Sequence, residues 1–218
     1  MSAALFEAIK AGDNARVGAL LDSDPGLVNA KNEQGVNAYM FARYLRQDAV
    51  ARTLVEHGAE LDLFSAIIAG AEERVTDLLA DDRAVVNSYS QDGWTPLHMA
   101  AFFGQPTVAE ILMANGADVH ARSRNAMENT PLHAGVAGRN VEAVAVLLAH
   151  GADVNARQHG GWTPLQATAQ NGDTELASLL LAHGADASAR AENNQTALDL
   201  AMTKGHQAMV DLLDGGSA

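Results

Sequence analysis

Short apolar stretches with helical spacing alternate with polar turns along this chain. One stretch begins at Thr95-Pro96 and is apolar from Leu97 to Phe103. Threonine caps a helix through its hydroxyl, and proline suits the first helical position, where no amide partner is needed. Gly104 should end this helix. A second helix is expected from about Thr107 to Ala114, closed by Asn115-Gly116. The pattern predicts a turn, a helix, a turn and a helix.

The same marks recur at a fixed period. Thr-Pro-Leu begins at residues 95, 130 and 163, and Gly-Ala-Asp begins at residues 116, 151 and 184. Both marks therefore advance by 35 and then 33 residues. In the N-terminal half, 5–62 and 63–119 align as two copies of one double unit at an offset of 58. A unit of this size cannot bury its apolar face alone, so stacked copies are expected.

We therefore predict one domain over 1–218, an all-α solenoid of stacked helix-turn-helix units with hairpin loops. The first and last units should act as caps. The approximate units are 2–35, 36–62, 63–93, 94–128, 129–161, 162–194 and 195–218.

Three places depart from the repeat and should be irregular or mobile. Arg46-Gln47 stands where a glycine between helices is expected, and Gly135-Val136 stands inside a helix. The hairpin 122–129 is two residues longer than its neighbours. In that hairpin Glu128 occupies the place of a turn glycine.

Composition narrows the classes of protein. Apolar residues make up 48% of the chain and charged residues 19%, which is typical of a globular protein. No apolar run approaches the length of a membrane span, and the N-terminus lacks the basic start of a signal peptide, so we expect a cytoplasmic protein. The absence of cysteine excludes thiol chemistry. A net charge of −13 disfavours nucleic acid and anionic membranes as partners.

The candidate chemistry points away from an enzyme. No HExxH, GxSxG, GxGxxG or GxxxxGK[ST] pattern occurs. His98 and His133 are expected to bond the neighbouring cap hydroxyl and loop backbone. His57, His150 and His183 each precede a glycine and should cap helix C-termini. We predict no catalytic residue, no metal and no cofactor.

At this point the residues carry a family resemblance. Thr-Pro-Leu-His at 95–98 and 130–133, with Gly-Ala-Asp-Val-Asn-Ala at 151–156, resembles the ankyrin repeat. The resemblance covers essentially the whole chain and is weaker in 1–93. It implies antiparallel helix pairs, a concave surface made by hairpins and first helices, and a function in binding other proteins.

Large aromatic residues occupy positions that the repeat does not need for its own packing. Trp94 precedes a helix cap, while Phe102 and Phe103 end the same helix. Tryptophan and tyrosine are frequent binding hot spots, so we place the centre of binding here. In the alternative interpretation, one phenylalanine fills the seam beside Ala137 and Gly138.

A row of arginines is the second unusual feature. Arg122, Arg157 and Arg190 share one hairpin position, and Arg124 adds to them. Two interpretations remain open. The row either recognises an acidic strip or helix of a partner, or is neutralised locally by carboxylates. The local candidates are Glu128, Asp153, Asp186 and Glu192.

The leading hypothesis is a noncatalytic, monomeric protein-binding module with an unidentified protein partner, in a narrower version an inhibitor or neutraliser. The alternatives are a small-ligand-binding protein that uses 135–138, and a structural or homo-oligomeric repeat protein. The predicted partner-binding residues are Tyr89, Gln91, Asp92, Trp94, Phe102, Phe103, Arg122, Arg124, Met127, Arg157, His159, Trp162, Gln170, Asn171 and Arg190.

Overall fold

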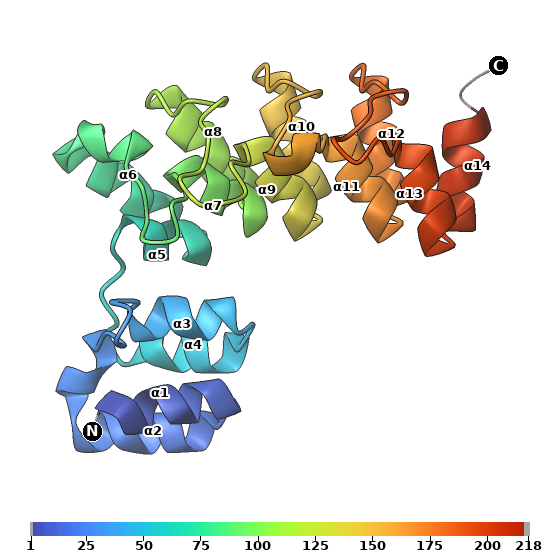
Figure 1. Ribbon diagram of the computed structural model, residues 1–218. Helices are drawn as coiled ribbons and strands as arrows, with labels where there is room; N and C mark the ends of the chain where they lie inside the picture. Colours follow the sequence, from blue (N-terminus) through green and yellow to red (C-terminus); the bar gives the residue numbers. More distant parts are fainter. Residues whose placement is uncertain (1, 216–218) are drawn as a thin grey trace. The chain divides into compact units, whose positions relative to one another are not determined.

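The computed structural model describes residues 2–215, and this range is all-α, as predicted (Figure 1). Fourteen α-helices follow one another in it, with three short 3-10 helices between some of them. Within the same range, extended pairing is limited to one isolated bridge between Lys31 and Asn37. The helices fall into two compact parts, Met1–Ala69 and Gly70–Ala218. The organisation of the chain as one domain stays a prediction.

The first part is built around α3. Its helix α1 packs on α2 and α3, and α3 also contacts α4 and α5. An edge-to-face pair of Phe6 and Phe41, with ring centroids 5.4 Å apart, joins α1 to α3. The elements are α1 (Ser2–Ala11), α2 (Asn14–Ser23), η1 (Pro25–Asn29), α3 (Ala38–Tyr44), α4 (Asp48–Glu56) and α5 (Leu63–Ala69).

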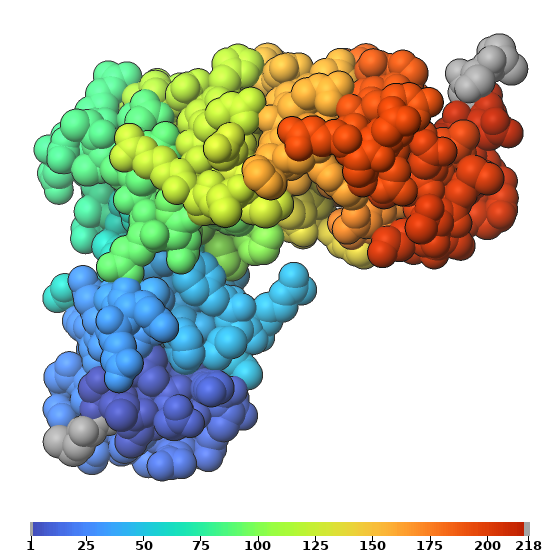
Figure 2. Space-filling view, in the orientation of Figure 1, coloured from blue at the N-terminus to red at the C-terminus, as the bar shows by residue number. Residues whose placement is uncertain are grey.

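The second part is a two-layered stack. Helices α7, α9, α11 and α13 pack one on the next, and α6, α8, α10, α12 and α14 form the second row. Its successive units appear as adjacent bands of colour in Figure 2. The elements are α6 (Glu72–Asp81), η2 (Arg83–Asn87), α7 (Pro96–Phe102), α8 (Pro106–Ala114), α9 (Pro131–Gly138), α10 (Val141–Ala149), η3 (His159–Gly161), α11 (Pro164–Asn171), α12 (Thr174–Ala182), α13 (Ala197–Lys204) and α14 (Gln207–Gly215).

Equivalent leucines form the core of this stack. Leu97, Leu132, Leu165 and Leu200 come from the first helices and are at most 4% exposed. Their counterparts in the second helices are buried as well: Leu112, Leu147, Leu180 and Leu213. Burial of one such side chain contributes about 1.5–3 kcal/mol, so the repeated leucines hold the two layers together.

In every unit, a residue with a left-handed backbone conformation follows the first of the two helices. Five of these residues are glycines, which adopt positive φ without steric cost. Arg46 and Arg139 take the same conformation, with φ of 56° and 59°. Glu128, in the long hairpin, has φ of 48° and replaces the turn glycine in the same way. Arg46 and Glu128 thus keep the backbone conformation of the glycines that they replace, which is uncommon for residues with a side chain. The five glycines are Gly12, Gly70, Gly104, Gly172 and Gly205.

Gly135 also leaves its helix regular, since α9 runs unbroken from Pro131 to Gly138. A Cβ atom at Gly135 would lie 2.9 Å from the Cγ2 atom of Val144 in α10. That contact is too short for a real side chain. The glycine therefore allows α9 and α10 to approach closely.

Buried histidines connect one unit to the next, as predicted for His98 and His133. Nδ1 of His98 lies 2.7 Å from Oγ1 of Thr95, and its Nε2 lies 2.9 Å from the carbonyl oxygen of Asn129. His133 repeats both contacts, at 2.9 Å to Thr130 Oγ1 and 3.2 Å to the carbonyl of Trp162. A carbonyl only accepts, so Nε2 donates and Nδ1 must be an unprotonated acceptor.

Burial lowers the pKa of both histidines from 6.5 to about 4, although the bond from Nε2 to the backbone opposes the shift. Between pH 6.5 and 4 the unfolded chain therefore binds protons that the folded chain excludes. The free energy of unfolding is highest above the unfolded pKa and falls as the pH drops toward the folded pKa. Each histidine accounts for about 3 kcal/mol of this loss.

Gln166 provides a natural replacement for testing this linkage, because it stands at the same position in the next unit. Its Oε1 accepts from the backbone amide of Thr163 at 2.9 Å, and its Nε2 donates to the carbonyl of Gln195 at 2.7 Å. We expect the double variant His98→Gln/His133→Gln to lose much less stability between pH 6.5 and 4 than the wild type. Urea unfolding across this range measures the difference. Parallel curves for the two proteins would contradict it.

Candidate functional site

Three aromatic side chains of the second part, which come from residues just before α7 and at its C-terminal end, contact one another in series. The rings of Trp94 and Phe102 lie edge to face at 5.1 Å between centroids, and Phe102 meets Phe103 in the same way at 5.2 Å. All three residues are partly exposed. We call Trp94, Phe102 and Phe103 the aromatic cluster.

The cluster rests on the helix cap described above. Trp94 directly precedes Thr95, the N-cap of α7, and its ring lies 6.1 Å from the buried His98 ring. The α7 residues between the two ends, Pro96 to Ala101, are buried. The sequence thus buries the middle of α7 in the repeat core and leaves the aromatic residues at its ends partly exposed.

Gly138 and Asn140 fix the end of α7 from the next unit. A Cβ atom at Gly138 would collide with the carbonyl oxygen of Phe102. The side-chain amide of Asn140 donates to that same oxygen at 2.6 Å and to the carbonyl of Ala101 at 3.1 Å. The atoms nearest to the empty Cβ position of Gly138 therefore belong to a backbone carbonyl and an amide. Neither phenylalanine ring is among them.

The hairpins of the second part are joined by backbone hydrogen bonds. The amide of Arg124 donates to the carbonyl of Gly93 at 2.8 Å, and the amide of His159 donates to the carbonyl of Met127 at 2.9 Å. A third bond, from Glu192 to Gly160, continues the series at 2.9 Å. We call hairpins 89–94, 122–129, 157–162 and 190–195, linked in this way, the hairpin strip.

Arg122, Arg157 and Arg190 each close their own hairpin. Nη1 of Arg122 donates to the carbonyl of Glu128 at 3.0 Å, and Nη1 of Arg157 donates to that of Gly161 at 2.9 Å. Arg157 also reaches the next hairpin, at 2.8 Å from the carbonyl of Arg190. Arg190 bonds the carbonyl of Asn194 at 2.7 Å. The guanidinium groups therefore hold backbone rather than neighbouring carboxylates.

Most members of the row form no ion pair with the carboxylates that could neutralise them locally. Within residues 2–215, Arg122, Arg124 and Arg157 form no ion pair. Arg190 approaches a carboxylate at 3.9 Å, but this carboxylate belongs to Asp199. Hydrogen bonds from the backbone and then the hydroxyl of Thr196 lower the pKa of that carboxyl. The carboxylates expected as partners lie beyond ion-pair distance. Hydrogen bonds from Ser188 lower the pKa of one of them, Asp186, and the charge of Arg157 adds a smaller contribution.

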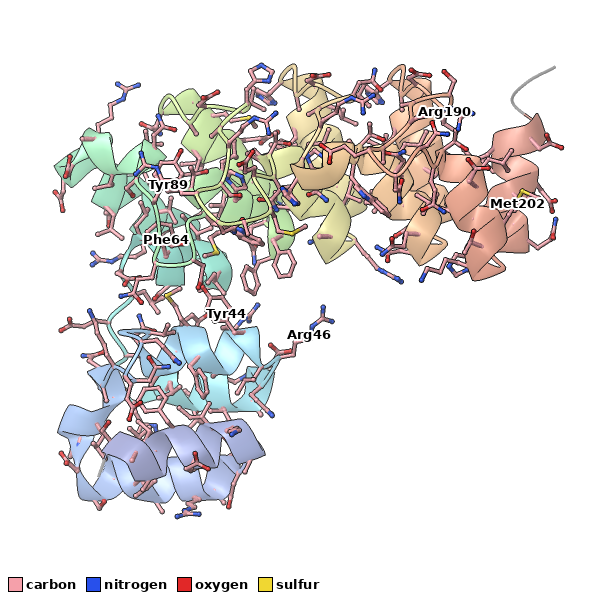
Figure 3. All side chains as sticks on the ribbon, viewed as in Figure 1. Tyr44, Arg46, Phe64, Tyr89, Arg190 and Met202 are labelled. Atoms are coloured by element: carbon pink, nitrogen blue, oxygen red, sulfur yellow. The ribbon has the colours of Figure 1, made fainter. Side chains whose placement is uncertain are left out.

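Tyr89 and Arg124 form a separate contact. The guanidinium carbon of Arg124 lies 3.8 Å from the centroid of the Tyr89 ring, and the phenol donates to the carbonyl of Arg122 at 3.1 Å. Such a cation–π contact contributes about 0.5–1 kcal/mol at an exposed site. Tyr89 and Arg190 belong to different hairpins of the strip (Figure 3).

The other predicted site residues lie apart from the aromatic cluster. Trp162 is partly exposed beside Gly160, and among residues 2–215 it makes no ring contact with the cluster. Met127 is 49% exposed at the long hairpin. The remaining residues lie exposed on hairpins or at the end of α11: Gln91, Asp92, His159, Gln170 and Asn171.

Two asparagines that position the site were missed from the sequence. Asn140 holds the end of α7. Asn125 organises the long hairpin, because its Oδ1 accepts from the amide of Met127 at 3.0 Å and its Nδ2 donates to the carbonyl of Asp92 at 3.0 Å. Asparagine is favoured where a side chain replaces a turn bond, and this was the available signal.

The surface histidines behave as predicted helix caps. Nδ1 lies 2.7 Å from the carbonyl four residues earlier for His57, and 2.9 Å for His150 and His183. In the described range, no group of three or more His, Asp or Glu side chains is placed to hold a metal ion. No helix in that range is long and apolar enough to cross a bilayer.

The chain belongs to the ankyrin repeat family. The family model described as "Ankyrin repeats (3 copies)" matches residues 63–158 and 156–216, which together make up more than half of the chain. Ankyrin repeats are generally protein–protein interaction modules, and the family is typically noncatalytic.

Three relatives illustrate the similarity. The chain is 40% identical over 121 residues to Ankyrin repeat and SAM domain-containing protein 6 of Rattus norvegicus, covering 56% of this chain and 11% of the relative. It is 28% identical over 129 residues to SH3 and multiple ankyrin repeat domains protein 2 of Homo sapiens, covering 55% and 7%. Mitochondrial disaggregase of Bos taurus is 36% identical over 141 residues, covering 60% and 20%. The chain thus spans a small fraction of these relatives' length.

Gly138→Ala tests how the end of α7 is held. The added methyl group would displace the carbonyl of Phe102 or the Asn140 amide, so we expect a loss of about 1–3 kcal/mol in stability and a change in Trp94 fluorescence. Gly18→Ala is the matched control, because Gly18 lies inside α2 with nothing within 4 Å of its Cβ position. Helix propensity predicts that this control is stabilised by about 1 kcal/mol. Equal stability of the two variants would contradict the close approach of Gly138 to the carbonyl of Phe102.

Proposed function

We propose that this chain is a noncatalytic module that binds one protein partner through the aromatic cluster and the hairpin strip. The observation that carries the proposal is the edge-to-face series of Trp94, Phe102 and Phe103, whose rings are in contact and partly exposed. Binding hot spots are enriched in large aromatic residues that contribute much contact area with few rotatable bonds.

The arrangement of the site supports this role. Backbone bonds between hairpins order the strip before a partner arrives, and Asn140 orders the end of α7. Groups that are already ordered lose less conformational entropy on association, so more of the contact energy appears as affinity. This order before binding supports the proposal that the surface binds a protein partner.

The narrower proposal is an inhibitor, which would act by covering the working surface of its partner. Expression of the chain beside that partner would then suppress the partner's activity. A partner that binds the chain and keeps full activity rules the inhibitor version out. We also expect the module to act as a monomer in the cytoplasm. Light scattering at high protein concentration measures the molar mass and so tests whether the chain is a monomer.

The small-ligand alternative gains no support from segment 135–138. The Cβ position of Gly135 faces a methyl group of Val144, and that of Gly138 faces the Phe102 carbonyl. The glycines accommodate packing between helices. No structural feature of this segment favours a metabolite over a protein partner.

Trp94→Ala/Phe102→Ala tests the proposed surface. Each truncation of a hot-spot aromatic costs at least about 2 kcal/mol, or about 30-fold in affinity, so the double variant should lose partner capture. Capture by the immobilised chain, followed by titration calorimetry with the captured protein, measures the effect. The circular dichroism spectrum should remain helical, because Leu97 and the other core leucines are untouched.

Met202→Ala is the control for that experiment. Met202 lies on α13 and is 63% exposed, so its truncation removes exposed apolar area outside the proposed site (Figure 3). The control should bind like the wild type. A double aromatic variant that folds and still captures the partner would overturn the assignment of the surface.

A further inference from the structure

The hairpin strip carries cations that this chain leaves without ion pairs, although acidic residues are in large excess. The net charge is −13, with 27 Asp and Glu against 14 Lys and Arg. Yet Arg122, Arg124 and Arg157 form no ion pair within residues 2–215. We propose that the strip binds an acidic segment of the partner protein, whose carboxylates contact these three arginines. This inference rests on the proposed function and specifies the chemistry of the partner.

The guanidinium groups are fixed but not saturated. Arginine has five N–H donors. Arg122 uses one bond to the carbonyl of Glu128, and Arg157 uses only Nη1 for its two carbonyl contacts. Both residues are exposed. The remaining N–H groups can donate to both oxygens of a carboxylate, and the fixed fork loses little entropy in doing so.

Arg122 and Arg157 line one hollow of about 400 Å³ between neighbouring hairpins. His120 and Asp153 also line it. Oδ1 of Asp153 accepts from the amide of Asn155 at 2.9 Å, and its carboxylate lies beyond ion-pair distance of both arginines. Two arginines and one aspartate line the hollow, so its lining carries a net positive charge. A carboxylate side chain of the partner fits this balance.

The long hairpin adds a third cation and an apolar contact. Arg124 lies over the Tyr89 ring by one face, which leaves its N–H edges available. Met127 is 49% exposed on the same hairpin. Its carbonyl accepts a hydrogen bond from the amide of His159, in the hairpin that begins at Arg157. A segment with acidic residues around one apolar side chain would therefore match the arginines and Met127 together.

The total charge of the chain opposes such a segment at long range. Charges more than about 10 Å apart are largely screened at physiological salt, so this repulsion is weak when the segment is in place. Binding should then depend on the particular arginines in contact and not on the field of the whole protein. Substituting individual arginines of the strip therefore tests the inference.

The probe is a short fluorescein-labelled peptide of glutamates around one central leucine, titrated with the full chain and followed by fluorescence anisotropy. We expect it to bind, and the version with glutamine for every glutamate not to bind. Arg122→Gln/Arg157→Gln should weaken binding at least about tenfold, since each substitution removes charged hydrogen bonds to the carboxylates of the peptide. Arg83→Gln should bind like the wild type. Arg83 is exposed and also bonds a backbone carbonyl, that of Asn115, so it is a matched control.

Arg122→Lys/Arg157→Lys separates charge from hairpin shape. Lysine keeps the charge but lacks the guanidinium fork. The inference predicts that the lysine variant retains more affinity for the peptide than the glutamine variant does. Equal losses in both variants would overturn it, as would equal binding of the glutamate and glutamine peptides.

The remaining outcomes distinguish this inference from the proposed function. Partner capture that needs Trp94 and Phe102 but survives Arg122→Gln/Arg157→Gln overturns the inference alone. Peptide binding that needs the arginines, with partner capture unaffected by the aromatic substitutions, supports the inference and refutes the proposed surface. A dimer of the chain that the glutamate peptide dissociates would identify a second copy as the occupant and overturn the choice of a separate partner.

Discussion

The buried cap at the start of the first helix is the interaction on which the second part of this protein depends. In one unit the cap joins Thr95 to His98, and the same imidazole reaches the carbonyl of Asn129 in the following unit. It therefore begins α7 and also holds the base of the next hairpin. Because burial keeps this ring neutral, its hydrogen-bond directions are fixed. Trp94 and the hairpin strip are positioned by the groups that this cap locks in place.

Scaffold and site use neighbouring residues of one short helix. The middle of α7 is buried in the stack, and its ends carry the aromatic cluster. The hairpins combine two roles in the same way, because Arg122 and Arg157 each use part of the guanidinium group to close a hairpin and leave other N–H groups unbonded. A side chain that is already held by the fold is well prepared for recognition, since little entropy remains to be lost. The residues proposed to bind the partner therefore also stabilise the repeat.

The period of the chain was enough to predict the fold. Thr-Pro-Leu and Gly-Ala-Asp mark helix starts and ends through local chemistry, so α7 and α8 could be placed to within a residue. The left-handed backbone of Arg46, Glu128 and Arg139 was harder to predict, because charged residues adopt this conformation far less often than glycine does. The sequence placed Trp94 before the helix cap and Phe102 at the end of the same helix, at positions that the repeat does not need for its own packing. The arginine contacts could not be predicted, since backbone carbonyls are acceptors everywhere and a sequence does not show which one is in reach. Asn125 and Asn140 were missed for the same reason.

The central claim is that the partner lies on the hairpin strip and the aromatic cluster. Hydrogen exchange of the chain with and without the captured partner tests it most directly, because protection is read along the whole backbone. We predict added protection in hairpins 89–94, 122–129 and 157–162 and at the end of α7, with α10 and α12 unchanged. Protection confined to α8, α10 and α12, with the hairpins unaffected, would contradict the claim.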